Sequence, residues 1–102
     1  MANYVYLYLG GQRAETPEAQ EEQMQAWSAW LSMLGDSVVE IGNPFGASAT
    51  VSRDGTADGA VSRAGGYSVV AADSLEAAAT NAKGCPILHT GGTVEVYEAI
   101  QM

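Results

Sequence analysis

Apolar residues recur along the chain with the two-residue period of strands in some segments and the three- to four-residue period of helices in others. Residues 4–9 read Tyr-Val-Tyr-Leu-Tyr-Leu and end at Gly10-Gly11, which predicts a first strand followed by a turn. Residues 93–100 alternate in the same way. We therefore expect strands near both ends of the chain.

A helical pattern follows the first strand. Thr16 is a suitable N-cap, Pro17 fits the first helical position, and Gly35 is a natural helix end. The apolar stripe between them has helical spacing and consists of Met24, Trp27, Trp30, Leu31 and Leu34. We expect a helix over residues 17–34 that packs on the sheet, although its tryptophan pair could instead line a ligand site.

The middle of the chain contains three shorter segments with strand composition, over residues 37–42, 48–53 and 66–72. Between the last two, residues 54–63 carry glycine and aspartate and have neither helical nor strand periodicity. This stretch is therefore expected to be a loop.

A second helix is predicted after Asp73, whose side chain would form a capping box with Glu76, and Gly84 and Pro86 end it. The resulting order, β-α-β-β-β-α-β, matches the ferredoxin-like split βαβ unit with one extra short strand. Right-handed crossovers place both helices on one face of the antiparallel sheet. The sequence thus predicts an α+β, ferredoxin-like fold, and 102 residues suit a single domain over residues 1–102.

The composition excludes several classes of function. Twelve acidic residues against four scattered basic ones give a net charge of -8, so no nucleic-acid partner is expected. Neither a membrane-spanning run nor a secretory signal is visible, so we expect a cytoplasmic protein without a membrane partner. One histidine and one cysteine cannot complete a metal site, and the glycine pairs lack the residues of phosphate loops, so neither metal nor cofactor is expected.

Strand alternation sends successive side chains to opposite faces of a sheet. We expect the core under the helices to contain Val5, Leu7 and Leu9, together with Val39, Ile41, Val94 and Val96. The other face would then carry four tyrosines and two glutamates, namely Tyr4, Tyr6, Tyr8, Tyr97, Glu40 and Glu95. Tyrosine can bury its ring while its hydroxyl finds a partner, so we expect a homodimer that packs these faces together. The alternative is a monomer with hydrated tyrosine pairs.

In their order and spacing these segments resemble the YCII-related proteins, particularly the small bacterial proteins with a DGPF domain. The resemblance rests on the opening strand with its two glycines, the Trp27 helix ending Leu34-Gly35, Gly65-Gly66-Tyr67 before the Asp73 segment, Gly84-Cys85-Pro86, and Gly91-Gly92 before the last strand. It implies a dimeric α+β barrel of ferredoxin-like subunits. It also implies a family of mostly unknown function, in which a few relatives are enzymes acting on chlorinated aromatic intermediates.

The sequence departs from that family in two places. Where the Asp-Gly-Pro-Phe motif belongs, residues 56–61 read Thr-Ala-Asp-Gly-Ala-Val. Relatives with a proposed His-Asp pair carry the histidine in the first half of the chain, where this sequence has none. The resemblance therefore implies a fold and an assembly, but not catalysis by such a pair.

Two residues are candidate catalytic groups. His89 is the one side chain whose type titrates near neutral pH, and Glu40 lies among apolar strand residues whose burial would favour an acid–base role. Tyr6, Tyr67 and Trp27 could form the aromatic wall of a site for a small aromatic or carbonyl ligand.

Alternative roles remain open for these residues. Glu40 and Glu95 could instead accept hydrogen bonds from tyrosine hydroxyls across the dimer, and His89 could be a solvated loop residue. Three functional hypotheses follow: a dimer that binds a small molecule, a lyase or isomerase that uses Glu40 or His89, and a non-catalytic structural or regulatory dimer.

Overall fold

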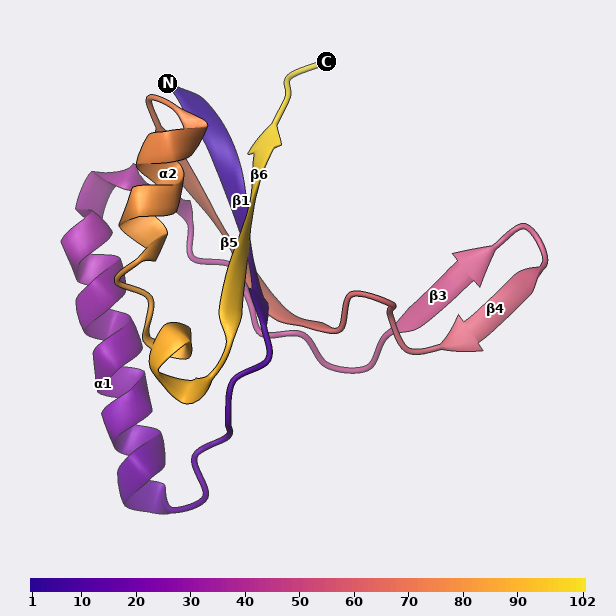
Figure 1. The fold of residues 1–102 in the computed structure, drawn as a ribbon, viewed down its shortest axis with the longest axis horizontal. Helices are drawn as coiled ribbons and strands as arrows, with labels where there is room; N and C mark the ends of the chain where they lie inside the picture. Colours follow the sequence, from indigo (N-terminus) through magenta and orange to yellow (C-terminus); the bar gives the residue numbers. More distant parts are fainter.

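The computed structural model describes all 102 residues. Its elements in chain order are β1 (Ala2–Leu9), α1 (Pro17–Leu34), the 3-10 helix η1 (Gly35–Ser37), β2 (Val38–Glu40), β3 (Ala49–Ser52), β4 (Gly55–Asp58), β5 (Ala64–Ala72), α2 (Leu75–Ala82), the 3-10 helix η2 (Pro86–Thr90) and β6 (Thr93–Ala99). A four-stranded antiparallel sheet carries both helices on one face (Figure 1). The predicted α+β class with two helices and an antiparallel sheet is confirmed.

The strand order of the sheet is β2-β5-β1-β6, so β1 and β5 are its central strands. This order is compatible with a ferredoxin-like fold. Val5 of β1 lies opposite Val69 of β5 and Tyr97 of β6. Since directly opposed residues of an antiparallel pair point to the same side, these three side chains share one face of the sheet.

The core lies on the other face of the sheet and is largely aromatic. Its buried members are Tyr4, Tyr6, Tyr8, Trp30, Val70, Ala72, Ala78, Ala82 and Cys85. The predicted assignment of the two faces is therefore wrong for β1, because its tyrosines lie under the helices and Val5, Leu7 and Leu9 lie on the open face. It is correct for β6, where Val94 and Val96 pack against the core. Both sets of β1 side chains are apolar, so the alternation alone does not tell which set the helices cover.

Small residues on α2 leave room for these tyrosines. Ala78 and Ala82 are the buried residues of α2, and their small side chains let the helix approach the sheet closely. The Tyr6 hydroxyl donates a hydrogen bond of 2.5 Å to the carbonyl oxygen of Ala78. From α1, the ring of Trp30 stacks on that of Tyr6 with centroids 6.0 Å apart. Both helices thus contact the face of β1 that carries the tyrosines.

The helix ends follow capping rules. The Thr16 hydroxyl accepts a hydrogen bond from the backbone N–H of Ala19, as predicted for the start of α1. At α2 the cap is Ser74, whose hydroxyl accepts a hydrogen bond from the N–H of Ala77, and the expected cap at Asp73 is wrong by one residue.

Neither helix has the combination of length and hydropathy that crossing a bilayer requires.

A separate two-stranded hairpin, β3–β4, interrupts the pattern between β2 and β5. Its second strand falls inside residues 54–63, which were expected to form a loop. Nearly every residue of the hairpin is exposed, so no apolar alternation marks this strand in the sequence. The hairpin extends away from the sheet on the side opposite the helices (Figure 1).

Candidate ligand-binding site

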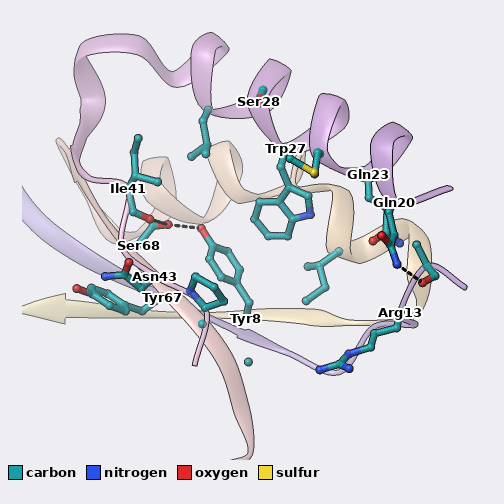
Figure 2. A pocket seen from close by; sticks show the side chains of 18 of the residues that line it. Tyr8, Arg13, Gln20, Gln23, Trp27, Ser28, Ile41, Asn43, Tyr67 and Ser68 are labelled. Carbon is teal, nitrogen blue, oxygen red and sulfur yellow. Dashed lines mark hydrogen bonds between the residues drawn. The ribbon is translucent and has the colours of Figure 1, made fainter. Parts of the chain in front are cut away.

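A cavity of about 840 Å³ lies between α1 and the end of the sheet where β1 ends and β5 begins (Figure 2). Its floor and walls come from the first turn after β1, the inner face of α1, the segment after β2 and the start of β5. The larger apolar and polar side chains that line it include Tyr8, Arg13, Gln20, Gln23, Met24, Trp27, Leu31, Ile41, Asn43, Ser68 and Ile87. The volume suits a small organic molecule, since ligand cavities span about 300–1,000 Å³.

Two aromatic rings form the apolar centre of this cavity. Tyr8 is the last core tyrosine of β1, and Trp27 belongs to the apolar stripe of α1. Their rings meet edge to face, with centroids 4.8 Å apart and planes at 83°. Figure 2 shows the Tyr8 ring rising from the strand towards Trp27. A flat apolar ligand would therefore find an aromatic surface here.

The polar end of Tyr8 belongs to a chain of hydrogen bonds. Its hydroxyl donates to the Ser68 hydroxyl at 2.7 Å, and Ser68 in turn donates to the carbonyl oxygen of Ile41 at 2.5 Å. Burial raises the pKa of Tyr8 to about 12, with the Ser68 hydrogen bond acting in the opposite direction. At neutral pH the hydroxyl stays protonated, so it can orient a ligand but is a poor general acid or base.

The wall opposite α1 depends on a close approach of two backbone segments. Gly42 has a φ of +80°, and its Cα faces the carbonyl of Tyr67 so closely that a Cβ would lie 1.8 Å from that oxygen. After Gly42, two backbone hydrogen bonds join the segments. The Tyr67 N–H donates to the carbonyl oxygen of Asn43 at 3.2 Å, and the Phe45 N–H donates to the carbonyl oxygen of Gly65 at 2.8 Å. β2 consequently ends at Glu40, two residues earlier than predicted, and the chain continues as the cavity wall.

Charge is sparse around the cavity. Arg13 is its only lining residue that is charged at neutral pH, and no Asp, Glu, His, Lys or Cys lines it. Gln20 and Gln23 lie near Arg13, and their side-chain amides donate to the carbonyl oxygens of Ala14 and Gln12 at 3.5 and 3.3 Å. These contacts tie the segment that carries Arg13 to α1.

The two residues predicted as catalytic lie outside this cavity. Glu40 is exposed at the end of edge strand β2, where its carboxylate accepts a hydrogen bond of 3.0 Å from the Tyr67 hydroxyl. His89 is exposed in η2, just before β6 at the other edge of the sheet. The burial on which the hypothesis for Glu40 depends is therefore missing. The structure does not bring the two residues together.

The three residues predicted as a ligand wall have different positions. Trp27 lines the cavity. Tyr6 is fully buried under α2 and does not line it. Tyr67 contributes to the lining, but its ring stacks on Phe45 with centroids 5.7 Å apart, on the open face of the sheet. The hydrogen bond to Glu40 raises the pKa of Tyr67.

Of the six residues predicted for a dimer interface, three are unavailable to a partner. Tyr4, Tyr6 and Tyr8 are buried within the chain by the two helices. The other three, Glu40, Glu95 and Tyr97, remain exposed. The Tyr97 hydroxyl donates to a Glu95 carboxylate oxygen at 3.0 Å, which raises the pKa of Tyr97. Pairing of glutamate with tyrosine thus occurs, but within one chain.

Sequence reasoning missed the residues that give the cavity its polar character. Tyr8 was assigned to an interface, and Arg13 and Ser68 were not considered for a site. One signal was available for Arg13, because it is one of four basic residues and follows the glycine turn at the end of a strand. No local pattern marks Ser68, since only the fold brings it beside Tyr8.

Comparison with known proteins gives a family. The model of the YCII-related domain matches residues 3–102, nearly the entire chain. Neither a curated protein nor a solved structure matches the chain. The resemblance carried by the sequence motifs is therefore confirmed at the level of the family. The chain belongs to the YCII-related domain family.

Proposed function

We propose that the chain binds a small aromatic or carbonyl compound in the cavity between α1 and the sheet. The observation that carries this proposal is the cavity of about 840 Å³ with Tyr8 and Trp27 at its centre and a few polar side chains around them. Ligand sites in proteins commonly have this composition, with apolar walls and few polar groups that orient the bound molecule.

The lining favours binding over acid–base catalysis. A lyase or isomerase needs a group that exchanges protons near neutral pH within hydrogen-bond reach of the ligand. The cavity has no carboxylate, imidazole, amine or thiol, and the pKa of Tyr8 is about 12. Glu40 and His89 lie elsewhere, so a reaction that depends on them has less support than ligand binding does.

A thermal-shift screen of aromatic and carbonyl metabolites tests this proposal. We expect a ligand to raise the melting temperature of the wild type and of the controls Glu40→Gln and His89→Ala, whose substituted residues lie outside the cavity. The same ligand should give a smaller shift with Trp27→Leu, since the edge-to-face aromatic surface is lost. A ligand whose effect is unchanged in Trp27→Leu, or absent from a broad screen, would contradict binding at this site.

We also propose that the chain forms a homodimer through the open face of its sheet. No element of the chain covers this face, on which Val5, Leu7, Leu9 and Val69 lie beside Tyr67, Tyr97 and Glu95. An uncovered apolar face marks an interaction surface, and a second copy is the simplest partner. The β3–β4 hairpin extends on the same side and could reach around the partner (Figure 1).

Sedimentation equilibrium tests the dimer directly. The wild type should have twice the chain mass of 10.6 kDa at micromolar concentration. Leu7→Lys places a charge in the middle of the open face and should give a monomer. Met33→Lys, at a position of α1 that is 78% exposed, serves as the matched control and should remain dimeric. A wild-type mass near that of one chain would refute the proposal.

A further inference from the structure

We propose that the ligand of the cavity is an organic monocarboxylate, bound with its aromatic or otherwise apolar body against Trp27 and Tyr8 and its carboxylate at Arg13. This inference rests on the proposed function and names the chemical class of the ligand. It depends on three features of the cavity: the sign of its charge, the place of that charge relative to the aromatic rings, and the number of charged groups.

The sign of the charge is opposite to that of the protein. The chain carries twelve acidic residues and four basic ones, yet none of the acidic residues lines the cavity and one of the basic residues does. The other three basic residues are Arg53 at the turn between β3 and β4, Arg63 before β5, and Lys83 at the end of α2. The cavity is therefore a cationic site on an anionic molecule, which favours an anionic ligand.

The positions of the side chains suit a molecule with two ends. In Figure 2, Gln20 and Gln23 of α1 lie at one end of the cavity, and Arg13 lies below them at the level of the strands. The hydrogen-bonded pair of Tyr8 and Ser68 lies at the other end. Trp27 lies between these ends. No hydrogen bond joins Arg13 to the other lining side chains in this view, so its guanidinium remains available. A guanidinium binds a carboxylate through two parallel hydrogen bonds.

The number of charged groups defines the ligand further. With one arginine in the lining, a single negative charge is matched, and a second one on a dianion would find no further cation among the lining residues. A ligand amine would likewise find no carboxylate among the lining residues. The cavity thus selects against amino acids and phosphomonoesters, and a monocarboxylate with an apolar body fits its groups best.

The experiment compares molecules of similar shape that differ in charge. Phenylacetate, phenylacetamide and phenethylamine are titrated into the wild type, with binding followed by calorimetry and by tryptophan fluorescence. We expect phenylacetate to bind about tenfold more tightly than the amide, as a charge-assisted hydrogen bond allows. Phenethylamine should bind most weakly. The preference for the carboxylate should decrease as salt is added, because Arg13 is exposed to solvent.

Substitution at Arg13 tests its role. Arg13→Gln should reduce the affinity for phenylacetate to that for phenylacetamide and leave the affinity for the amide unchanged. Arg63→Gln is the matched control and should retain the full preference. Both side chains are exposed, so both variants should fold, which circular dichroism checks.

The possible outcomes separate this inference from the proposed function. Equal affinities for phenylacetate and phenylacetamide in the wild type would overturn the carboxylate inference and leave ligand binding in place. A preference that survives in Arg13→Gln would overturn the role of Arg13. If none of the three molecules binds at millimolar concentration, the inference is refuted, and the wider metabolite screen then decides separately whether the cavity binds ligands.

Discussion

Two core tyrosines of β1, Tyr6 and Tyr8, differ from aliphatic core residues in that each brings a hydroxyl into the interior. Tyr6 donates to the Ala78 carbonyl oxygen and Tyr8 donates to the Ser68 hydroxyl. Buried polar groups are tolerated only when they have hydrogen-bond partners, and no buried side-chain polar atom of the protein lacks one. The tyrosines therefore fix the position of α2 and of the cavity floor as well as filling space.

Tyr6→Phe should destabilise the protein because it removes one of these hydrogen bonds and leaves the Ala78 carbonyl oxygen without its side-chain donor. We expect the free energy of unfolding to fall by about 1–2 kcal/mol, measured by urea denaturation. Tyr97→Phe is the matched control, since the Tyr97 hydroxyl bonds to Glu95 at an exposed position and should contribute little. Equal effects of the two substitutions would contradict a special role for the buried hydroxyl.

Stability should fall in alkaline solution. Burial raises the pKa of Cys85 from 9.0 to about 11 and the pKa values of Tyr6 and Tyr8 from 10.0 to about 12. At a pH between the ordinary pKa of such a group and its raised pKa in the fold, the group is deprotonated in the unfolded chain and still protonated in the folded chain. A rising pH therefore favours the unfolded state. The contribution of these groups is complete below pH 9 and is lost progressively between pH 9 and pH 12.

Urea denaturation at pH values from 8 to 11 measures this loss. In Cys85→Ala the group with the lowest unfolded-state pKa is absent, so the decline should begin nearer pH 10 than pH 9. Unfolding midpoints that stay constant or increase over this range would contradict the prediction.

Among the elements, the connection from β2 to the hairpin carries a strict backbone requirement. Gly42→Ala would place a Cβ 1.8 Å from the Tyr67 carbonyl oxygen at a φ of +80°, and both effects oppose the substitution. We expect a loss of about 2 kcal/mol or more in the free energy of unfolding. Gly46→Ala, where a new Cβ would meet no atom within 4 Å, should change it little. The comparison fails if both variants have the same unfolding midpoint.

The β3–β4 hairpin should be dispensable for the fold of one chain but not for the dimer. A two-stranded hairpin in water is marginally stable alone, and this one is almost entirely exposed. The Gly59 N–H donates to the Ser48 carbonyl oxygen at 2.9 Å, so replacing residues 49–58 by two glycines closes the gap without strain. We expect unchanged circular dichroism and a weaker dimer by sedimentation. Loss of the fold, or an equally tight dimer, would contradict this prediction.

For the whole molecule, the open face of the sheet predicts a stability that depends on concentration. If folding and dimerisation are coupled, raising the protein from 1 to 100 μM should increase the melting temperature by roughly 5 °C. Leu7→Lys should remove this dependence and Met33→Lys should retain it. A wild-type melting temperature that is constant over this range would indicate that the open face has no partner of its own kind.

Much of the secondary structure could be predicted from the sequence because its signals are local. The bounds of α1 follow from Thr16, Pro17 and Gly35, and the strands at both ends of the chain follow from their alternation. The hairpin strand β4 could not be predicted, since both of its faces meet solvent and leave no apolar pattern. The cavity was not predictable either, because Tyr8, Trp27 and Ser68 are distant in the sequence and meet only in the fold.

The sequence by itself determined that β1 has two apolar faces and that one of them would remain uncovered by the chain. Only the tertiary structure decided which face is inside. The alternation of tyrosine with valine and leucine is the same whichever set is buried. The choice depends on residues of other elements. Ala78 and Ala82 of α2 leave space for large rings, and Trp30 of α1 stacks on Tyr6. The carbonyl oxygen of Ala78 accepts the hydrogen bond of the Tyr6 hydroxyl. Space and hydrogen-bond partners for a side chain exist only once the elements have packed.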